Sequence, residues 1–315
     1  MKAIKQLNYL IFASALFISC KKNSEDITVT PPPPPVVAKT EWVKLAPHSS
    51  STHLGKLFTL NGDIYVLIFD DGSLFQYLSS KDEWVKKTNF PGPTTIRYGY
   101  FTTAINGKVI VGGGSELSWG MPFNDMWEYD PLVNKWTSKK NLPNYIGDAV
   151  TTVFDNKAYY FNTRDNAVTI YDPASDQYTR IKDRTIPSPF EIKSAFVING
   201  KQYFTNKAFV LSRLIEYDPI SDTWKEYNTI PTKVTSHNGF ALNNIGYIMG
   251  ENQYLWKYDS VLDTWTKIDD RFWGYPNVQH QFVVLNNSAY LGLSGNSPTA
   301  NIASFYATTD FWKYK

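Results

Sequence analysis

Six short turn sequences recur along this chain, with their first residues 43 to 49 positions apart. Each is a dipeptide of Asn, Asp or Gly between two apolar runs, as in "LNGDIY" and "INGKVI". These residue types tolerate the positive φ of a type I′ turn, so each sequence predicts a β-hairpin. A repeated hairpin unit cannot bury its apolar surface alone and has to stack on its neighbours. The six turns begin at Asn61, Asn106, Asp155, Asn199, Asn243 and Asn286.

A pair of aromatic residues follows each of the first five hairpins, always seven positions apart. Most copies carry "YDP", and then Asp or Asn two positions before the second aromatic residue. Asp bonds its own backbone and Pro presets φ in tight turns, so the segment predicts a third strand, a turn and a fourth strand. We therefore interpret these carboxylates as turn residues rather than calcium ligands or acid and base catalysts. The pairs are Tyr77 and Trp84, Tyr129 and Trp136, Tyr171 and Tyr178, Tyr217 and Trp224, and Tyr258 and Trp265.

Composition agrees with an all-β chain. Aromatic residues make up 16% of the 315 residues, and such side chains favour half-buried pleated sheets. Six copies of a four-stranded antiparallel unit of about 45 residues predict a six-bladed β-propeller, in which each sheet buries both faces against its neighbours. First strands such as "SAFVI" (194–198) and "QFVVL" (281–285) fit this arrangement because they are apolar on both faces. We expect one propeller domain over residues 41–315.

The second repeat shows which kind of propeller this chain resembles. Its second strand ends in "VIVGGG" (109–114), followed by Tyr129 and then Trp136, a pattern that resembles the kelch family. No Trp-Asp dipeptide occurs anywhere in the sequence, which disfavours WD40 repeats. The resemblance extends over residues 42–315, although only the second repeat keeps a Gly-Gly pair. It implies a kelch-type propeller of the superfamily that includes galactose oxidase.

The chain ends in "DFWKYK" (310–315), where the repeat lacks its last strand. Aligned on Tyr314, this segment is the third strand of the sixth blade, so a fourth strand with an aromatic residue must come from elsewhere. The segment "EWVKLAP" (41–47) resembles "EWVKK" (83–87) of the first blade's last strand and offers Trp42. We expect residues 41–47 to pair with 310–315 and close the ring, which leaves no exposed sheet edge at the junction.

The N-terminal residues resemble a bacterial lipoprotein signal. Lys2 and Lys5 precede a largely apolar stretch (7–19) that is too short to span a bilayer of about 30 Å but suits a signal peptide. The only cysteine, Cys20, follows "LFIS", which resembles a lipobox and implies lipidation; the alternative is ordinary cleavage with Cys20 as a bystander. We expect a signal peptide over 1–19, a Pro-rich tether over 20–40, and a lipid-anchored protein of the bacterial cell envelope, in the outer membrane.

Loop lengths predict which face carries the binding site. The turns of an up-and-down meander alternate between two faces, and insertions at 112–125 and 293–310 both fall on the face opposite the short turns. Polar residues at the starts of the innermost strands and in these loops predict a pocket. An aromatic platform beside charged groups suits a sugar, so a glycan or a protein is the expected ligand. The candidate ligand-binding residues are Arg97, Tyr98, Glu116, Trp119, Arg164, Glu191, His237 and His280.

These residues bear on three candidate functions. We favour a non-catalytic binding or scaffold lipoprotein, monomeric and without a cofactor. The alternative is an enzyme resembling N-acetylneuraminate epimerase, with Glu191 or Glu116 for proton transfer and Arg97 or Arg164 for the substrate carboxylate. A copper oxidase like galactose oxidase is disfavoured because the sole Cys lies at the lipidation site. Four His without metal spacing indicate no metal site, and balanced charge indicates no nucleic-acid partner.

Overall fold

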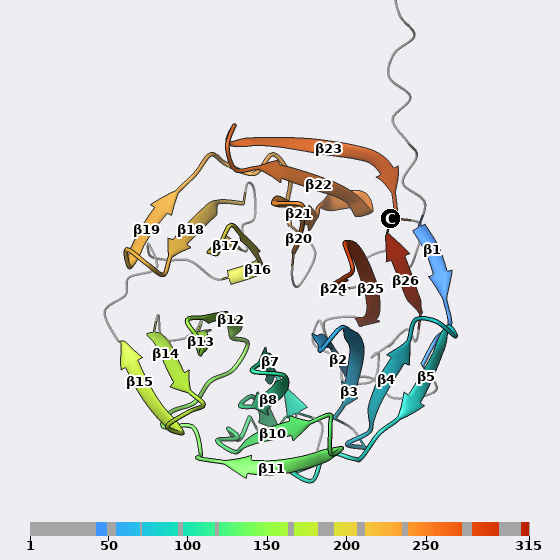
Figure 1. Cartoon of the computed structure of the whole chain (residues 1–315). Coiled ribbons are helices and arrows are strands. Elements are labelled where there is room, and N and C mark those ends of the chain that lie inside the picture. The colour runs from blue at the N-terminus through green and yellow to red at the C-terminus, as the bar shows by residue number, and fades with distance from the viewer. Residues whose placement is uncertain are drawn as a thin grey trace, which may run out of the picture. The chain divides into compact units, whose positions relative to one another are not determined.

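The computed structural model describes residues 42–48, 55–69, 71–93, 97–116, 120–162, 167–181, 192–206, 212–234, 239–272, 279–295 and 310–314. The signal peptide and tether predicted for residues 1–40 lie outside this part of the chain. Six four-stranded antiparallel sheets of these residues are arranged as the blades of a ring, with the first strand of each blade innermost (Figure 1). The prediction of an all-β, six-bladed propeller is confirmed.

Within each blade, the four strands succeed one another from the centre of the ring outward. Blade one holds β2 (Gly55–Leu60), β3 (Asp63–Ile68), β4 (Leu74–Leu78) and β5 (Glu83–Lys86); blade two holds β7 (Phe101–Ile105), β8 (Lys108–Gly112), β10 (Met126–Asp130) and β11 (Lys135–Lys139). Blade three holds β12 (Val150–Phe154), β13 (Lys157–Asn162), β14 (Ala167–Asp172) and β15 (Gln177–Ile181); blade four holds β16 (Ile192–Ile198), β17 (Lys201–Asn206), β18 (Leu214–Asp218) and β19 (Thr223–Glu226). Blade five holds β20 (Phe240–Leu242), β21 (Ile245–Met249), β22 (Tyr254–Asp259) and β23 (Thr264–Arg271); blade six holds β24 (Gln279–Leu285), β25 (Ser288–Gly295), β26 (Phe311–Tyr314) and β1 (Trp42–Leu45).

Three short elements of the described chain, two strands and a helix, lie outside the six four-stranded sheets. Strands β6 (Arg97–Tyr98) and β9 (Ser115–Glu116) form a separate two-stranded sheet beside blade two, and η1 (Glu251–Gln253) is a short 3-10 helix. Among the described residues, no helix has the length and apolar character needed to cross a membrane.

The turns have the conformations that the sequence predicts. The first residue of all six hairpin turns has a positive φ, between 47° and 51°, which explains why each is Asn or Asp. In the turns between third and fourth strands, a Tyr hydroxyl donates to an Asp or Asn five residues later, as from Tyr171 to Asp176 Oδ1 (2.8 Å). The same bond occurs in blades one, two, four and five. The prediction that these carboxylates are structural turn residues is confirmed.

The core lies between the blades rather than within them. Neighbouring residues of one innermost strand face opposite sides: Phe58 packs toward blade two, whereas Leu57 packs toward blade six. The five aromatic pairs seven residues apart, and the equivalent pair Trp42 and Tyr314 of blade six, are direct cross-strand partners with ring centroids 4.8 to 5.1 Å apart. Such pairs stabilise a sheet beyond their buried area. The blade repeat is therefore one packing unit used six times.

Blade six is closed by the two ends of the described chain. Strand β1 pairs with β26, and Trp42 lies opposite Tyr314 with ring centroids 4.9 Å apart. Trp42 also meets Phe272 of the neighbouring blade at 4.8 Å. The predicted pairing of segments 41–47 and 310–315 is confirmed, with register pairs from Trp42 to Leu45.

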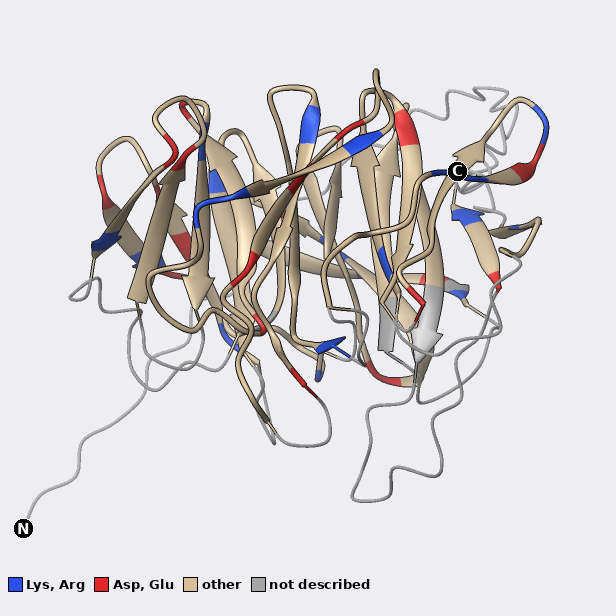
Figure 2. Ribbon diagram, turned by 90° about the horizontal axis from the view of Figure 1, so that it is seen from below, with Lys and Arg blue, Asp and Glu red and all other residues tan. Residues whose placement is uncertain are grey.

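The antiparallel order gives the ring two different faces. All hairpin turns and all turns between third and fourth strands lie on one face, which we call the turn face. The connections between second and third strands, and between blades, lie on the other, the loop face. Figure 2 shows the blades from the side, with acidic and basic residues interspersed rather than separated by sign.

Candidate functional site

The loop face of blade two bears a projection that departs from the plain repeat, and its described residues are 113–116 and 120–125. Strand β9 leaves the end of β8 and pairs with β6, so that Arg97 lies opposite Glu116 and Tyr98 opposite Ser115. Backbone bonds close the projection: the N–H of Glu116 donates to the carbonyl of Met121 and that of Phe123 to Gly114, at 2.9 and 2.8 Å. At its outer end Met121 is 61% exposed. The backbone bonds tie the described part of the projection together at the end of β8.

Glycines make this departure possible. Gly113 and Gly114 have φ of 65° and 80°, values that favour glycine. A Cβ on Gly113 would lie 2.3 Å from the carbonyl oxygen of Ile146, and one on Gly114 would lie 2.4 Å from that of Tyr98. The "GGG" of the sequence therefore allows two close backbone approaches at the base of the projection.

Arg97 anchors the projection from below. Its side chain is fully buried, and Nη2 donates to Asp125 Oδ1 at 2.7 Å. The guanidinium lies 4.0 Å from the ring centroid of Phe123 and 5.2 Å from that of Phe69 in blade one. Burial lowers the pKa of Arg97, while Asp125 raises it, and an arginine in such a setting keeps its charge. The guanidinium is thus paired with Asp125 and packed against aromatic rings.

Three of the predicted site residues are brought together by this arrangement. Arg97, Tyr98 and Glu116 share the β6–β9 sheet, and Tyr98 and Glu116 are partly exposed there. His280 lies in the innermost strand of blade six, where its side chain is outside the described part of the structure. The ligand-binding role of these residues stays a prediction. Trp119, Arg164, Glu191 and His237 lie outside the described residues.

Lys56 is a charged residue of the loop-face end of blade one that our sequence reasoning did not single out. Its Nζ donates to the carbonyl of Tyr100 at 2.9 Å and lies 5.5 Å from that residue's ring centroid. Burial lowers the pKa of Lys56 to about 8, against a smaller opposing effect of Asp148. The available signal was a lysine five residues before a hairpin turn, where blades two and three have Phe101 and Val150. Below about pH 8 the ammonium of Lys56 donates hydrogen bonds, and above this pH its amine can accept a proton from a ligand.

We expect Lys56 to titrate near pH 8. Because the folded protein holds this proton less tightly than the unfolded chain, the free energy of unfolding should rise as pH increases from about 8 toward the ordinary lysine value. NMR titration of isotopically methylated lysines would measure the pKa, with Lys56→Arg to assign the signal. Lys201 is the control, because Glu216 and Asp218 raise its pKa. Co-titration of Lys56 with Lys201 would contradict the expectation.

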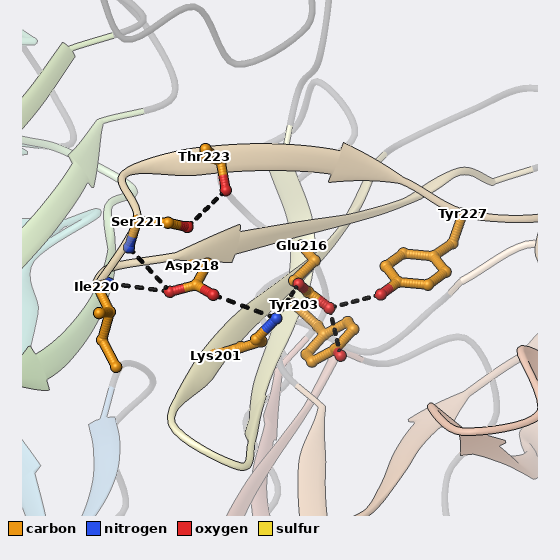
Figure 3. A network of polar contacts seen from close by, with 8 residues as sticks. All are labelled: Lys201, Tyr203, Glu216, Asp218, Ile220, Ser221, Thr223 and Tyr227. Carbon is orange, nitrogen blue, oxygen red and sulfur yellow. Dashed lines mark hydrogen bonds and ion pairs between the residues drawn. The ribbon is translucent and has the colours of Figure 1, made fainter.

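Glu216 in blade four is a deeply buried carboxylate, 4% exposed, and its hydrogen-bond partners indicate a structural role (Figure 3). Its Oε2 accepts from Tyr203 at 2.6 Å and from Tyr227 at 2.7 Å, and its Oε1 lies 2.9 Å from Lys201 Nζ. Burial raises the pKa of Glu216, but these hydrogen bonds outweigh burial and hold it below its ordinary value. A carboxylate that stays ionised and fully bonded stabilises the sheet and is poorly suited to transfer protons.

A hollow of about 300 Å³ lies on the turn face, opposite to the predicted site. Its lining consists of hairpin turns and the strand ends beside them. Within it, Asn61 Nδ2 donates to the carbonyl of Gly107 at 2.9 Å and ties blade one to blade two. The polar lining follows from turn conformation, so this hollow does not by itself indicate a ligand. The lining segments are Thr59–Gly62, Ala104–Gly107 and Val284–Asn286.

Groupings of acidic, His and Cys side chains that could hold a metal ion do not occur within the described ranges. The described side chains at the loop face of blades one and two offer hydrogen bonding and apolar contact. Exposed Met121, partly exposed Tyr98 and Glu116, and the amine of Lys56 supply these contacts.

Comparison with known proteins places the fold in one class. Residues 96–143, which comprise blade two with β6, match the family model of the Kelch motif. Together with the six-bladed fold, this match identifies the protein as a kelch-repeat β-propeller.

The chain is similar to Kelch-like protein 25 of Xenopus tropicalis (26% identity over 217 residues, 60% of this chain and 36% of that protein). It is similar to Kelch-like protein 35 of Mus musculus (23% over 200 residues, 61% of this chain and 33% of that protein). The chain thus spans about a third of the length of these curated relatives. A solved structure, "Structure of YjhT", has a similar fold, with a TM-score of 0.64, 16% identity, and coverage of 85% of this chain and 96% of that one.

Proposed function

We propose that this protein is a lipid-anchored binding propeller that presents its loop face to a protein partner. The observation that carries the proposal is the blade-two projection, which places exposed Met121 and Pro122 on a base fixed by a buried ion pair. Ordered loops on a rigid scaffold bind with little loss of conformational entropy. Similarity to Kelch-like proteins supports a protein as the ligand, and the sequence around Cys20 supports the anchor.

Partner binding is tested with a photo-crosslinking amino acid at Met121 in the full-length chain, produced in its native cells. We expect a discrete protein adduct from position 121, and none from the matched position Ser175, which is exposed on the turn face of blade three. Identical adducts from both positions, or none from either, would refute the loop face as the binding surface. A glycan-array signal lost in Tyr98→Ala, without a protein adduct, would replace the protein partner by a glycan.

Anchoring is tested separately with Cys20→Ser. We expect wild-type protein in the membrane fraction and the variant in the soluble fraction, because the lipid on Cys20 would supply membrane affinity of about 0.8 kcal/mol per buried CH₂ group. Mass spectrometry of the mature N-terminus would identify the lipid. Equal sedimentation of the two proteins with membranes would rule out Cys20 as the anchor.

A further inference from the structure

Five apolar side chains at the outer edge of the turn face are between 60% and 95% exposed to solvent. They all belong to the turns between third and fourth strands, in blades two, four and five. Isolated exposed apolar residues are ordinary, but here they occur at equivalent positions of a repeat. Their exposures are 88% for Leu132, 60% for Val133, 95% for Ile220, 88% for Val261 and 68% for Leu262. We call these residues the apolar turns.

The polar groups of the same turns are engaged within them. Asp218 Oδ1 accepts the N–H of Ile220 at 2.9 Å, and the side chain of Ile220 points away from the polar network (Figure 3). Asp259 Oδ1 accepts from the N–H of Val261 at 2.9 Å in the same way. These two carboxylates are thus bonded within their turns, and the apolar side chains project into solvent beside exposed polar residues such as Ser221 and Asp222.

The distribution of the apolar turns fits a flat surface better than a protein partner. Blades two, four and five lie at different positions around the ring, so the side chains do not form the compact patch of a protein interface (Figure 1). Equivalent turns of a propeller repeat lie at a similar height, so one plane can meet all of them together. A lipid bilayer is such a plane, and apolar side chains partition into its interfacial region.

The tether joins the domain at this same face. Trp42 pairs with Tyr314, which pairs in turn with Ala289, two residues after the turn residue Asn287. Strand β1 therefore begins at the turn face, where the other blades have their turn between third and fourth strands. The sequence places 21 residues between Cys20 and Trp42, and five of them are consecutive prolines, for which an extended polyproline II spacer of roughly 15 Å is expected.

We propose that the turn face rests on a phospholipid surface, with the apolar turns inserted among the headgroups. This inference rests on the lipid anchoring of Cys20 in the proposed function. The anchor brings the turn face to the bilayer, and insertion of the apolar turns fixes the orientation. The loop face with the blade-two projection then points away from the membrane, toward its partner.

The test uses the lipidated full-length chain in phosphatidylcholine vesicles. Cys20 is the only cysteine, and its sulfur is blocked by the lipid, so Ile220→Cys provides a single thiol for an environment-sensitive dye. Met121→Cys is the matched control, because it is exposed on the loop face. We expect blue-shifted emission and severalfold stronger quenching by nitroxide lipids at position 220 than at 121. Because contact is apolar, added salt should leave the difference unchanged.

Each other outcome overturns the inference. Equal, water-like emission at both positions in protein that floats with the vesicles refutes membrane contact while anchoring stands. Protein that fails to float refutes anchoring and the inference together. Shielding of position 220 that occurs without vesicles and grows with protein concentration assigns the apolar turns to a second copy of the chain.

Discussion

A chain that lacks residues 41–47 is expected to lose its cooperative thermal transition and its near-ultraviolet circular dichroism. The deletion removes β1, so the β26 edge is left unpaired and the cross-strand partner of Tyr314 is lost. It also removes the carbonyl of Ala46, which accepts from Trp84 Nε1 at 2.9 Å and ties the junction to blade one. Scanning calorimetry of the full-length and shortened chains would measure the effect. The same melting temperature for both would show that closure is dispensable.

A single substitution at Trp42 tests the same junction between β1 and β26 with a smaller perturbation. Trp42→Ala removes a ring packed between Tyr314 and Phe272, and we expect a loss of about 3 kcal/mol in the free energy of unfolding. Lys44→Ala in the same strand is the control: its side chain is 57% exposed and its ammonium pairs with Asp310 at 3.2 Å, so its effect should stay below about 1 kcal/mol. Equal losses from both variants in denaturant titrations would argue against the ring contact as the closing element.

Arg97→Ala is expected to destabilise the protein by about 3 kcal/mol, because it leaves Asp125 without its cation and empties a site among Phe69, Phe90 and Phe123. The loss of local stability should be largest in the projection. Hydrogen exchange at the amides of Gly114, Glu116 and Phe123 should accelerate more than exchange in other blades, since these amides close the projection.

The matched control for Arg97 is an exposed pair of the same type. Arg213 Nη1 lies 3.1 Å from Glu226 Oε1, with side chains 33% and 44% exposed. Arg213→Ala should cost less than about 1 kcal/mol, because solvent already screens the pair. A similar cost for both arginines, or unchanged exchange in the projection of Arg97→Ala, would mean that Arg97 is not its anchor.

Much of the fold could be predicted because its determinants are local and repeated. A residue such as Asn61 fixes a hairpin turn through its own φ, and the spacing from Tyr258 to Trp265 is that of two paired strands. Closure by Trp42 followed from the same periodicity, since a regular repeat shows what its last unit lacks.

The candidate site was less predictable because its residues depend on contacts between blades. Arg97 was predicted to bind a ligand from its place at the start of blade two, and this role stays a prediction; the packing of Phe69 and Phe90 against its guanidinium depends on the tertiary structure. Lys56 was not singled out, because burial and the backbone of Tyr100 set its environment. Only the predicted proximity of Arg97, Tyr98 and Glu116 could be compared with the structure, which places them in one small sheet.

By itself the sequence determined the blade count, the turns, the aromatic pairs and the closing strand, because each depends on neighbours in the chain or on a constant spacing. Only the tertiary structure decided which charges are buried and which apolar residues stay exposed. Packing between blades sets burial, and it encloses a side chain such as Arg97 in the fold while one such as Ile220 stays exposed to solvent.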